Sequence, residues 1–256
     1  DGNTWYNAEG AEIADPDVLA TSDGSVAPLL VDKEKTSALD ITSESFKDYS
    51  PQTNFMPRIS FSFPISEDAL FFAHYDVLTK RPGGAIRFDP TDYLFMESTT
   101  NTKSNPALLP ETTIDYEVGF QQKITNSSAL KMSAFYREFR DQVQLTYVSQ
   151  AYPREYRTYG NIDFGAVKGM TFSYDLRQTR NLTIRASYTI QFAEGTGSDA
   201  TTASALVQAG LDNLKVTNPM NFDRRHQIQT TLDYRYGSGK NYNGPVINDK
   251  QILANT

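Results

Sequence analysis

Two pairs of side chains in this sequence have residue types and spacings that could do proton chemistry. Asp115 and Glu117 lie two residues apart, so on an extended strand both carboxylates point to one face, as an acid/base pair would. His74 precedes Asp76 with the same spacing, which could make the imidazole a proton-sensitive group. On a hydrated protein wall the same residues would be solvated, hydrogen-bonding groups, and we adopt this plainer interpretation.

Other catalytic and metal-binding patterns are missing from the sequence. It contains no G-x-S-x-G, H-E-x-x-H or P-loop motif. Cys is absent and His74 and His226 are far apart, which removes disulfides, thiolate catalysis and a His-based zinc site. The formal net charge of -7 argues against a nucleic-acid partner, because phosphate binding needs a basic face. We therefore predict a protein that is not an enzyme and has no metal site or cofactor.

Alternation of apolar and polar residues is the main pattern from residue 58 onward. In 112–123, a face made of Ile, Tyr, Val and Phe alternates with a face that carries the two carboxylates. The 15 Tyr and 15 Phe also fit strands. Glycines 160, 165 and 169 are expected to mark bulges or bends. The alternation predicts about seven strands, at 58–65, 69–79, 112–123, 129–138 continuing towards 148, 156–177, 182–192 and 227–236.

The connections between these predicted strands alternate in length. Those at 66–68, 124–128, 178–181 and after 236 are short, whereas 80–111, the segment around 140–157, and 193–225 are long. Outer-membrane barrels have this asymmetry, with short periplasmic turns and long extracellular loops. Charged residues also lie in mid-strand, where a dry core would penalise each by several kcal/mol but a wet lumen would not. They are Asp115, Glu117, Lys131, Arg137, Asp175, Arg185, Asp233 and Arg235.

The sequence therefore predicts an all-β fold, an antiparallel transmembrane β-barrel, in three regions. Residues 1–57 are expected to be a polar extracellular loop region, 58–240 barrel strands with short periplasmic turns and long extracellular loops, and 241–256 the start of an unfinished barrel segment. No run of about 18 apolar residues predicts a transmembrane helix. About seven strands are too few for a closed barrel, so we expect part of a larger one. The start at Asp1 likewise suggests a processed product or a piece of something longer.

Residues 105–122, NPALLPETTIDYEVGFQQ, resemble the N-P-x-L-x-P-E-x-x-x-x-Y-E-x-G signature of TonB-dependent outer-membrane receptors. Further stretches resemble the Bacteroidetes branch, which carries a carboxypeptidase-regulatory-like domain at its N-terminus. These are PRISFSFPISEDALFFAHY, FYREFRDQVQ, YGNIDFGAVKGMTFSYDLR, LTIRASYTIQFAEGTGS and NFDRRHQIQTTLDYRYGSG. The resemblance covers about residues 55–240. The signature positions are Asn105, Pro106, Leu109, Pro110, Glu111, Tyr116, Glu117 and Gly119.

The resemblance implies a barrel of about 22 strands around a plug. It also implies nutrient import across the bacterial outer membrane, driven by TonB through a plug that this chain lacks. The expected partners are outer-membrane lipid, the TonB system and a surface lipoprotein, with the signature at the extracellular rim. Two alternatives stay open at this point. One is a barrel of the same fold that serves as a surface scaffold or complex component, and the other is a soluble carbohydrate-binding β-sandwich.

Aromatic and basic residues of the expected outer loops are candidates for contact with a ligand or partner. Aromatic rings could stack on sugars or peptides, and Arg could hold carboxylates or phosphates. The alternative for each aromatic residue is loop packing or a place in the interfacial girdle. Tyr and Arg cluster at 147–157, which predicts a ligand- or partner-facing tip. The candidates are Trp5, Tyr6, Arg81, Tyr93, Tyr147, Tyr152, Arg154 and Arg157.

Overall fold

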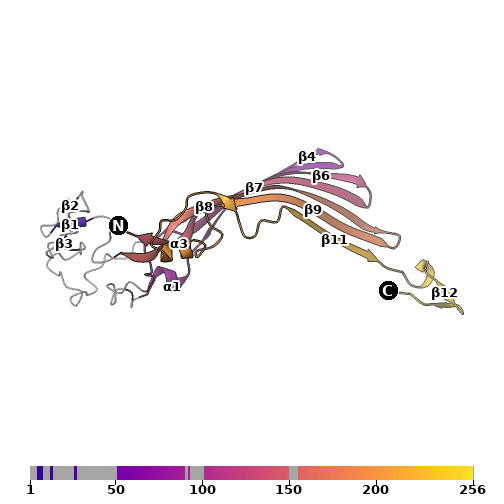
Figure 1. Cartoon of the computed structure of the whole chain (residues 1–256). Coiled ribbons are helices and arrows are strands. Elements are labelled where there is room, and N and C mark those ends of the chain that lie inside the picture. Colours follow the sequence, from indigo (N-terminus) through magenta and orange to yellow (C-terminus); the bar gives the residue numbers. More distant parts are fainter. Residues whose placement is uncertain are drawn as a thin grey trace.

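A computed structural model describes residues 51–89, 92, 101–149 and 155–255, with the backbone of three short strands nearer the N-terminus (Figure 1). Those strands, β1 (Trp5–Asn7), β2 (Glu12–Ile13) and β3 (Val26–Ala27), form a small antiparallel sheet of their own. The main body is one sheet of long antiparallel strands, so the predicted all-β architecture is confirmed. Its long strands are β4 (Arg58–Ser66), β5 (Ala69–Lys80), β6 (Glu111–Thr125), β7 (Ser128–Val148), β8 (Tyr156–Thr179), β9 (Leu182–Gly195) and β11 (His226–Tyr234).

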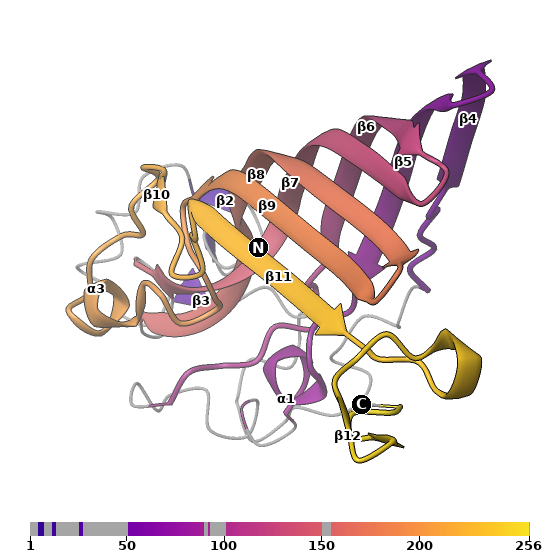
Figure 2. The same ribbon diagram turned by 90° about the vertical axis from the view of Figure 1, so that its right-hand side faces the viewer.

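Each long strand pairs with its neighbours in sequence. The order is β4-β5-β6-β7-β8-β9, and β11 follows on β9. The two-residue strand β10 (Asn218–Pro219) pairs with β9 near its outer end. Figure 2 shows the strands lying side by side in one curved, twisted sheet. Within the described residues β4 and β11 are its two open edges, and in lipid both edges need further strands to satisfy their backbone groups.

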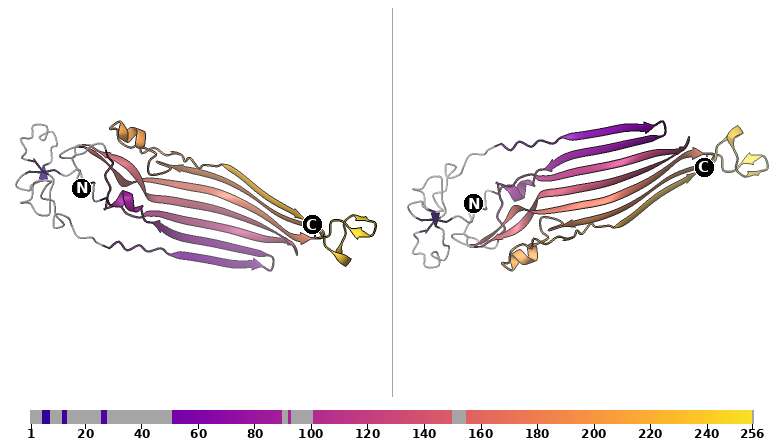
Figure 3. Two further views of the ribbon diagram at one scale, coloured as in Figure 1. Left: turned by 90° about the horizontal axis from the view of Figure 1, so that it is seen from below. Right: turned by 90° about the horizontal axis from the view of Figure 1, so that it is seen from above.

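Tight turns and long connections occupy opposite ends of the sheet (Figures 1 and 3). Turns of two residues, at 67–68, 126–127 and 180–181, close the hairpins at one end. At the other end the long connections contain two short helices, α1 (Gly84–Arg87) and α3 (Ser204–Gln208). The predicted alternation of loop lengths is present, with one difference. The segment around 140–157 is mostly strand, so the hairpin β7–β8 projects beyond its neighbours.

The two faces of the sheet differ as the sequence predicts. Phe71, Phe120, Met132, Phe172 and Tyr188 are register partners on five successive strands and form one apolar row. Large apolar side chains on this side are widely exposed, as lipid contact requires. The opposite side carries the mid-strand charges. We call these two sides the outward face and the inward face.

The β7–β8 register shifts between Phe139 and Gln142 and again between Gln142 and Val143. Gly165 borders the first shift as the partner of Phe139, and Gly160 lies next to the second, whereas Gly169 lies within regular pairing. Asp141 lies inside the first shift with a φ of 55°, a left-handed conformation that Asp tolerates better than most residues. The extra residue of the first shift therefore lies on β7, whereas that of the second, Ile162, lies on β8.

Two glycines of the inward face leave space for aromatic rings. A Cβ on Gly169 would lie 2.7 Å from Cζ of Phe135, which stands directly opposite it on β7. Gly119 of β6 receives the ring of Phe72 in the same way, and Phe72 is only 7% exposed. Phe72 is the residue that interrupts the alternation of apolar and polar residues in β5. The space above Gly119, which has no Cβ, accommodates its ring on the polar face.

The described residues after β11 form small elements in place of another long strand. They are the 3-10 turn η4 (Gly239–Asn241) and a hairpin of β12 (Val246–Ile247) and β13 (Lys250–Gln251). The strand predicted over 227–236 ends at Tyr234. Among the described helices, none has the length and apolar character needed to cross a membrane.

Candidate ligand-facing site

Four charged side chains form a row across the inward face. Arg58, Asp76, Asp115 and Arg137 are consecutive register partners on β4, β5, β6 and β7. The two carboxylates stand opposite each other, and each has an arginine on its outer side. Nε of Arg58 lies 3.2 Å from Oδ1 of Asp76, and Nε of Arg137 donates to Oδ2 of Asp115 at 3.0 Å. The row is charge-balanced, which allows two like charges to face each other.

Another pair of opposite charges lies on the inward face of β6 and β7. Lys131 lies 3.8 Å from Glu117 and 4.5 Å above the centre of the Phe72 ring. His74 hydrogen-bonds the Ser60 hydroxyl at 2.9 Å. No cluster of metal-ligating side chains occurs among the described residues. On the described strands the inward face thus carries charges that are compensated by neighbours.

The hairpin β7–β8 leaves the wall at its outer end. Pairing of β7 with β6 ends at Arg140, and pairing of β8 with β9 ends at Gly165. We call residues 142–148 of β7 and 156–163 of β8 the outer arm. Glu111 of the signature makes the last contact between β6 and β7, because its carboxylate accepts a hydrogen bond from the Val143 N–H at 3.1 Å. Lys80 lies 3.6 Å from the same carboxylate.

The rest of the signature lies against one edge of the outer arm. The Asn105 side-chain amide donates to the Tyr159 carbonyl at 2.8 Å. Asn161 binds Leu109 twice: its Oδ1 accepts from the Leu109 N–H at 2.8 Å and its Nδ2 donates to the Leu109 carbonyl at 2.9 Å. Leu108 between these contacts is 2% exposed. The signature turn is therefore fixed to β8 by two asparagines.

Asn161 was not singled out by the sequence. It lies in a strand stretch, YGNIDFG, where an amide reads as an ordinary polar strand residue. Its position directly before the register shift of β8 places its side chain on the turn, which is 52 residues away in sequence. Only the resemblance of YGNIDFG and NPALLPE to one family links the two segments in advance.

The connection after β9 covers the other edge of the outer arm. The Leu145 N–H donates to the Ala200 carbonyl at 2.8 Å, and the Asn213 amide donates to the Leu145 carbonyl at 2.7 Å. Gln144 is 1% exposed and its amide donates to both Asp163 and the Asp199 carbonyl, at 2.8 Å and 3.0 Å. Both edges of the arm are thus occupied by loops that come from opposite sides of the sheet.

Two of the predicted contact residues meet at the tip of the arm. Tyr147 and Arg157 are register partners. The Tyr147 hydroxyl donates to the Glu155 carboxylate, and this hydrogen bond raises the pKa of the phenol. Arg157 donates to the Gln208 carbonyl at 3.2 Å. Both side chains are half-buried, and Arg157 helps to hold the loop that contains α3.

The other candidates are not gathered with this pair. Arg81 is exposed in the connection after β5. The side chains of Trp5, Tyr6, Tyr93, Tyr152 and Arg154 lie outside the described residues, so their contacts stay predictions.

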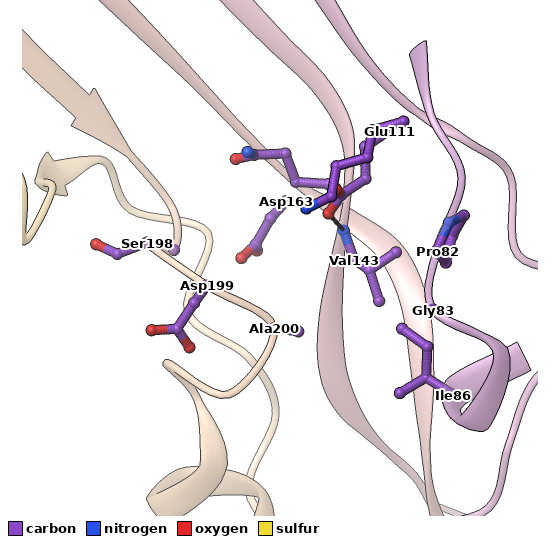
Figure 4. Close-up of a pocket in the computed structure, with 12 residues that line it drawn as sticks. Pro82, Gly83, Ile86, Glu111, Val143, Asp163, Ser198, Asp199 and Ala200 are labelled. Atoms are coloured by element: carbon purple, nitrogen blue, oxygen red, sulfur yellow. Dashed lines mark hydrogen bonds and ion pairs between the residues drawn. The ribbon is translucent and has the colours of Figure 1, made fainter.

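A pocket of about 280 Å³ lies at the base of the outer arm (Figure 4). Its walls come from the connection after β5, from the arm and from the connection after β9; Ile86, Val143 and Asp199 represent the three segments. Hydrogen bonds from the hydroxyl and the N–H of Thr201 lower the pKa of Asp199. The pocket's carboxylates are therefore occupied by internal partners, and its shape depends on how the two loops sit on the arm.

The chain matches a protein-family model and several solved structures. The family model described as TonB dependent receptor-like, beta-barrel matches residues 31–255. Among solved structures the chain is similar to the outer membrane transporter YddB of Escherichia coli, with 17% identity and a TM-score of 0.49, over 71% of this chain and 26% of that one.

Two further solved structures are similar to the chain. The alcaligin receptor FauA of Bordetella pertussis has 17% identity and a TM-score of 0.46, over 76% of this chain and 28% of that one. The ferric-catecholate import receptor Fiu of E. coli K12 has 14% identity and a TM-score of 0.46, over 70% and 22%. No curated protein matches the chain.

The chain spans between 22% and 28% of the length of these three structures. The family model, in contrast, covers most of the chain itself. An open sheet with one apolar and one charged face, and with turns and loops at opposite ends, is what a section of such a barrel wall must look like. The chain belongs to the TonB-dependent receptor family and forms part of its β-barrel in the bacterial outer membrane.

Proposed function

We propose that this chain supplies wall strands and outer loops to a transporter that imports a nutrient across the outer membrane, with energy delivered by TonB through a plug. The observation that carries the proposal is the inward face, where the charges of four successive strands pair with one another. Such a face suits a water-filled passage. Opposite charges on neighbouring strands pair with each other, so few unpaired charges remain that could bind a charged solute as it passes.

The chemistry of this proposal is recognition and passage, with no bond made or broken. Membership in a family of receptors and transporters supports it. The wall residues would remain hydrated, and the first contact with the nutrient would occur at the outer loops. The chemical class of the nutrient is left open, since the ligands named for the similar structures belong to those proteins.

The tip of the outer arm is the part proposed to meet the nutrient or a partner protein. Tyr147 and Arg157 lie side by side there, and Tyr152 and Arg154 fall in the connection between them in sequence. Arg offers a rigid fork of donors to carboxylates or phosphates, and Tyr offers a flat face to sugars or peptides.

The test uses the full-length gene in its own bacterium. Strains with and without the gene are grown in the same rich medium, and the spent media are compared by mass spectrometry of all solutes. At least one solute too large for general porins should persist only in the deletion strain. A strain that lacks TonB function should leave the same solute behind.

The variant Tyr152→Ala with Arg154→Ala then tests the tip. Uptake of the identified solute should fall at least about tenfold, as expected when an aromatic and an arginine anchor are both removed. Unchanged uptake would reject the tip as the contact surface. Identical spent media from the wild-type and deletion strains would reject import itself.

A further inference from the structure

We propose that the outer arm is a hinged element, and that the N-P-x-L-x-P-E turn is the catch that holds it against the barrel mouth. The arm bends at the double register shift around Asp141 and is held by side-chain hydrogen bonds on both edges. Its use in admitting a nutrient rests on the proposed function, whereas its movement does not.

The hinge is located by the ends of the sheet pairing. Inside the wall, β7 and β8 are each bonded to a strand on both sides. Beyond Arg140 and Gly165 the arm has no ladder with a neighbouring long strand; apart from its internal pairing, its backbone makes an isolated parallel bridge between Lys103 and Thr158 and single hydrogen bonds to loops. The two register shifts fall at this point, and bulges bend a strand and interrupt its ladder. Asp141, with its positive φ, is the residue whose backbone already departs from strand geometry.

The first edge of the arm is held mainly by one side chain. Asn161 makes two hydrogen bonds to Leu109 and a third, at 2.7 Å, to the Asp141 carbonyl at the hinge. Asn161 therefore links the signature turn, the outer arm and the bend at Asp141. Asn105 adds one bond to the Tyr159 carbonyl, and Lys103 pairs its backbone N–H with the Arg157 carbonyl at 2.7 Å.

The second edge is held by the connection after β9. The contacts are the Asn213 amide on the Leu145 carbonyl and the Gln144 amide on the Asp199 carbonyl. Gly197 fits closely here, because a Cβ at that position would lie 2.7 Å from Nε2 of Gln144 and would also collide with Asp163. The contacts at both edges of the arm are polar contacts with loops, whereas the strands of the wall are joined by continuous backbone hydrogen bonding.

This difference explains why the arm and not the wall would move. Releasing the arm breaks hydrogen bonds to amide side chains and a few backbone bonds to loops, and it exposes buried side chains such as Gln144 and Leu145. The net contribution of each hydrogen bond is modest because water replaces the partner. Releasing a wall strand would leave a whole row of backbone groups unpaired in lipid. A ligand that contacts the tip could therefore shift the arm between its held and released positions.

The absence of Cys from the chain gives a direct test. Spin labels are placed on introduced cysteines at Ser149, beside the tip, and Ala107, in the signature turn, in the full-length protein in detergent. Both positions are exposed. Wild-type protein should give one narrow distance. Asn161→Ala removes three hydrogen bonds and should raise the population of longer distances at least about tenfold.

The matched control is Asn181→Ala at the opposite end of the barrel. Asn181 is 5% exposed and also locks a backbone carbonyl, that of Arg235, at 2.9 Å. Its loss should leave the Ser149–Ala107 distance narrow. A second label pair, at Glu67 and Arg180 in two short turns, reports on the wall and should not change in either variant.

The same narrow distance in Asn161→Ala as in the wild type would overturn the proposal, and so would equal broadening by Asn181→Ala. If Asn161→Ala fails to assemble in the outer membrane, Asn105→Ala takes its place, because it removes the bond to Tyr159, together with the bond from the Ala107 N–H within the turn, and spares the hinge. The distance measurement needs no nutrient. A failed uptake assay would therefore count against the proposed function and leave the hinge to be judged separately.

Discussion

Phe72 and Gly119 stand opposite each other on the inward face, and their fit is the clearest residue-level prediction. A Cβ on Gly119 would collide with the ring of Phe72 and would lie 2.8 Å from the Met132 carbonyl oxygen. The ring could turn aside, but the backbone oxygen cannot. Gly119→Ala should therefore lower the free energy of unfolding by about 1–3 kcal/mol, the usual penalty of overpacking.

The measurement is the midpoint of urea unfolding of the full-length protein in detergent micelles. Gly83→Ala is the control, since a Cβ at Gly83 meets no atom within 4 Å. Removing the ring should relieve part of the strain, so Gly119→Ala should cost less in a Phe72→Ala background than in the wild type. Equal costs in both backgrounds would show that the ring and the glycine are not coupled.

At the same scale, the signature motif illustrates what a sequence can and cannot reveal. The type and order of its residues indicated the family, and the alternation around Tyr116 and Glu117 placed them on opposite faces. The role of Glu111, accepting from the Val143 N–H, depends on a bulge in another strand. The role of Asn161 depends on a turn far away in sequence. Neither long-range contact leaves a local pattern.

At the scale of elements, we predict that the four charges of the row Arg58–Asp76–Asp115–Arg137 stabilise the inward face as a coupled unit. Arg137→Met removes the partner of Asp115 and leaves two carboxylates opposite each other with one arginine. The pair is partly exposed, at 47% and 24%, so the loss should be about 1 kcal/mol or less in unfolding free energy. Adding Asp115→Asn should recover most of it.

Arg185→Met is the control for this row. Arg185 lies 4.0 Å from Asp175 and the side chains are 78% and 61% exposed. An exposed pair at that distance contributes little, so unfolding of this variant should match the wild type. A larger loss from Arg185→Met than from Arg137→Met would contradict the assignment of the four-strand row as a coupled unit.

The strands themselves were predictable because alternation is a local property that survives in any sheet with two different faces. All seven long strands occur near their predicted residues. The ends were less predictable. The segment 140–157 was expected to act as a longer connection, although strand was predicted to continue towards 148 and to begin again at 156. β7 does run to Val148 and β8 does begin at Tyr156, and the loops that bind the arm's edges support this segment as strand. That support is tertiary and cannot be read from the segment alone.

At the scale of the whole molecule, the sheet has two open edges and an apolar face that only lipid, detergent or other protein can cover. Expressed alone, the chain should therefore not give a folded monomer without detergent, which gel filtration and circular dichroism would check. A folded, detergent-free monomer would favour a soluble sandwich and contradict the membrane assignment. The open edges carry the same implication, since unpaired strand edges associate in water.

The assignment of faces can be tested with two adjacent residues of β11. Ile228 lies on the outward face and is 75% exposed, whereas Gln229 lies on the inward face. Because both are near the middle of one strand, they differ mainly in which face they occupy. Ile228→Arg should lower the free energy of unfolding in lipid vesicles by about 2–4 kcal/mol, the cost of a cation at mid-membrane depth, while Gln229→Arg should change it little. A larger loss from Gln229→Arg than from Ile228→Arg would mean that the charged face lies against lipid. It would contradict the assignment of that face to a water-filled interior and the transport proposal that depends on it.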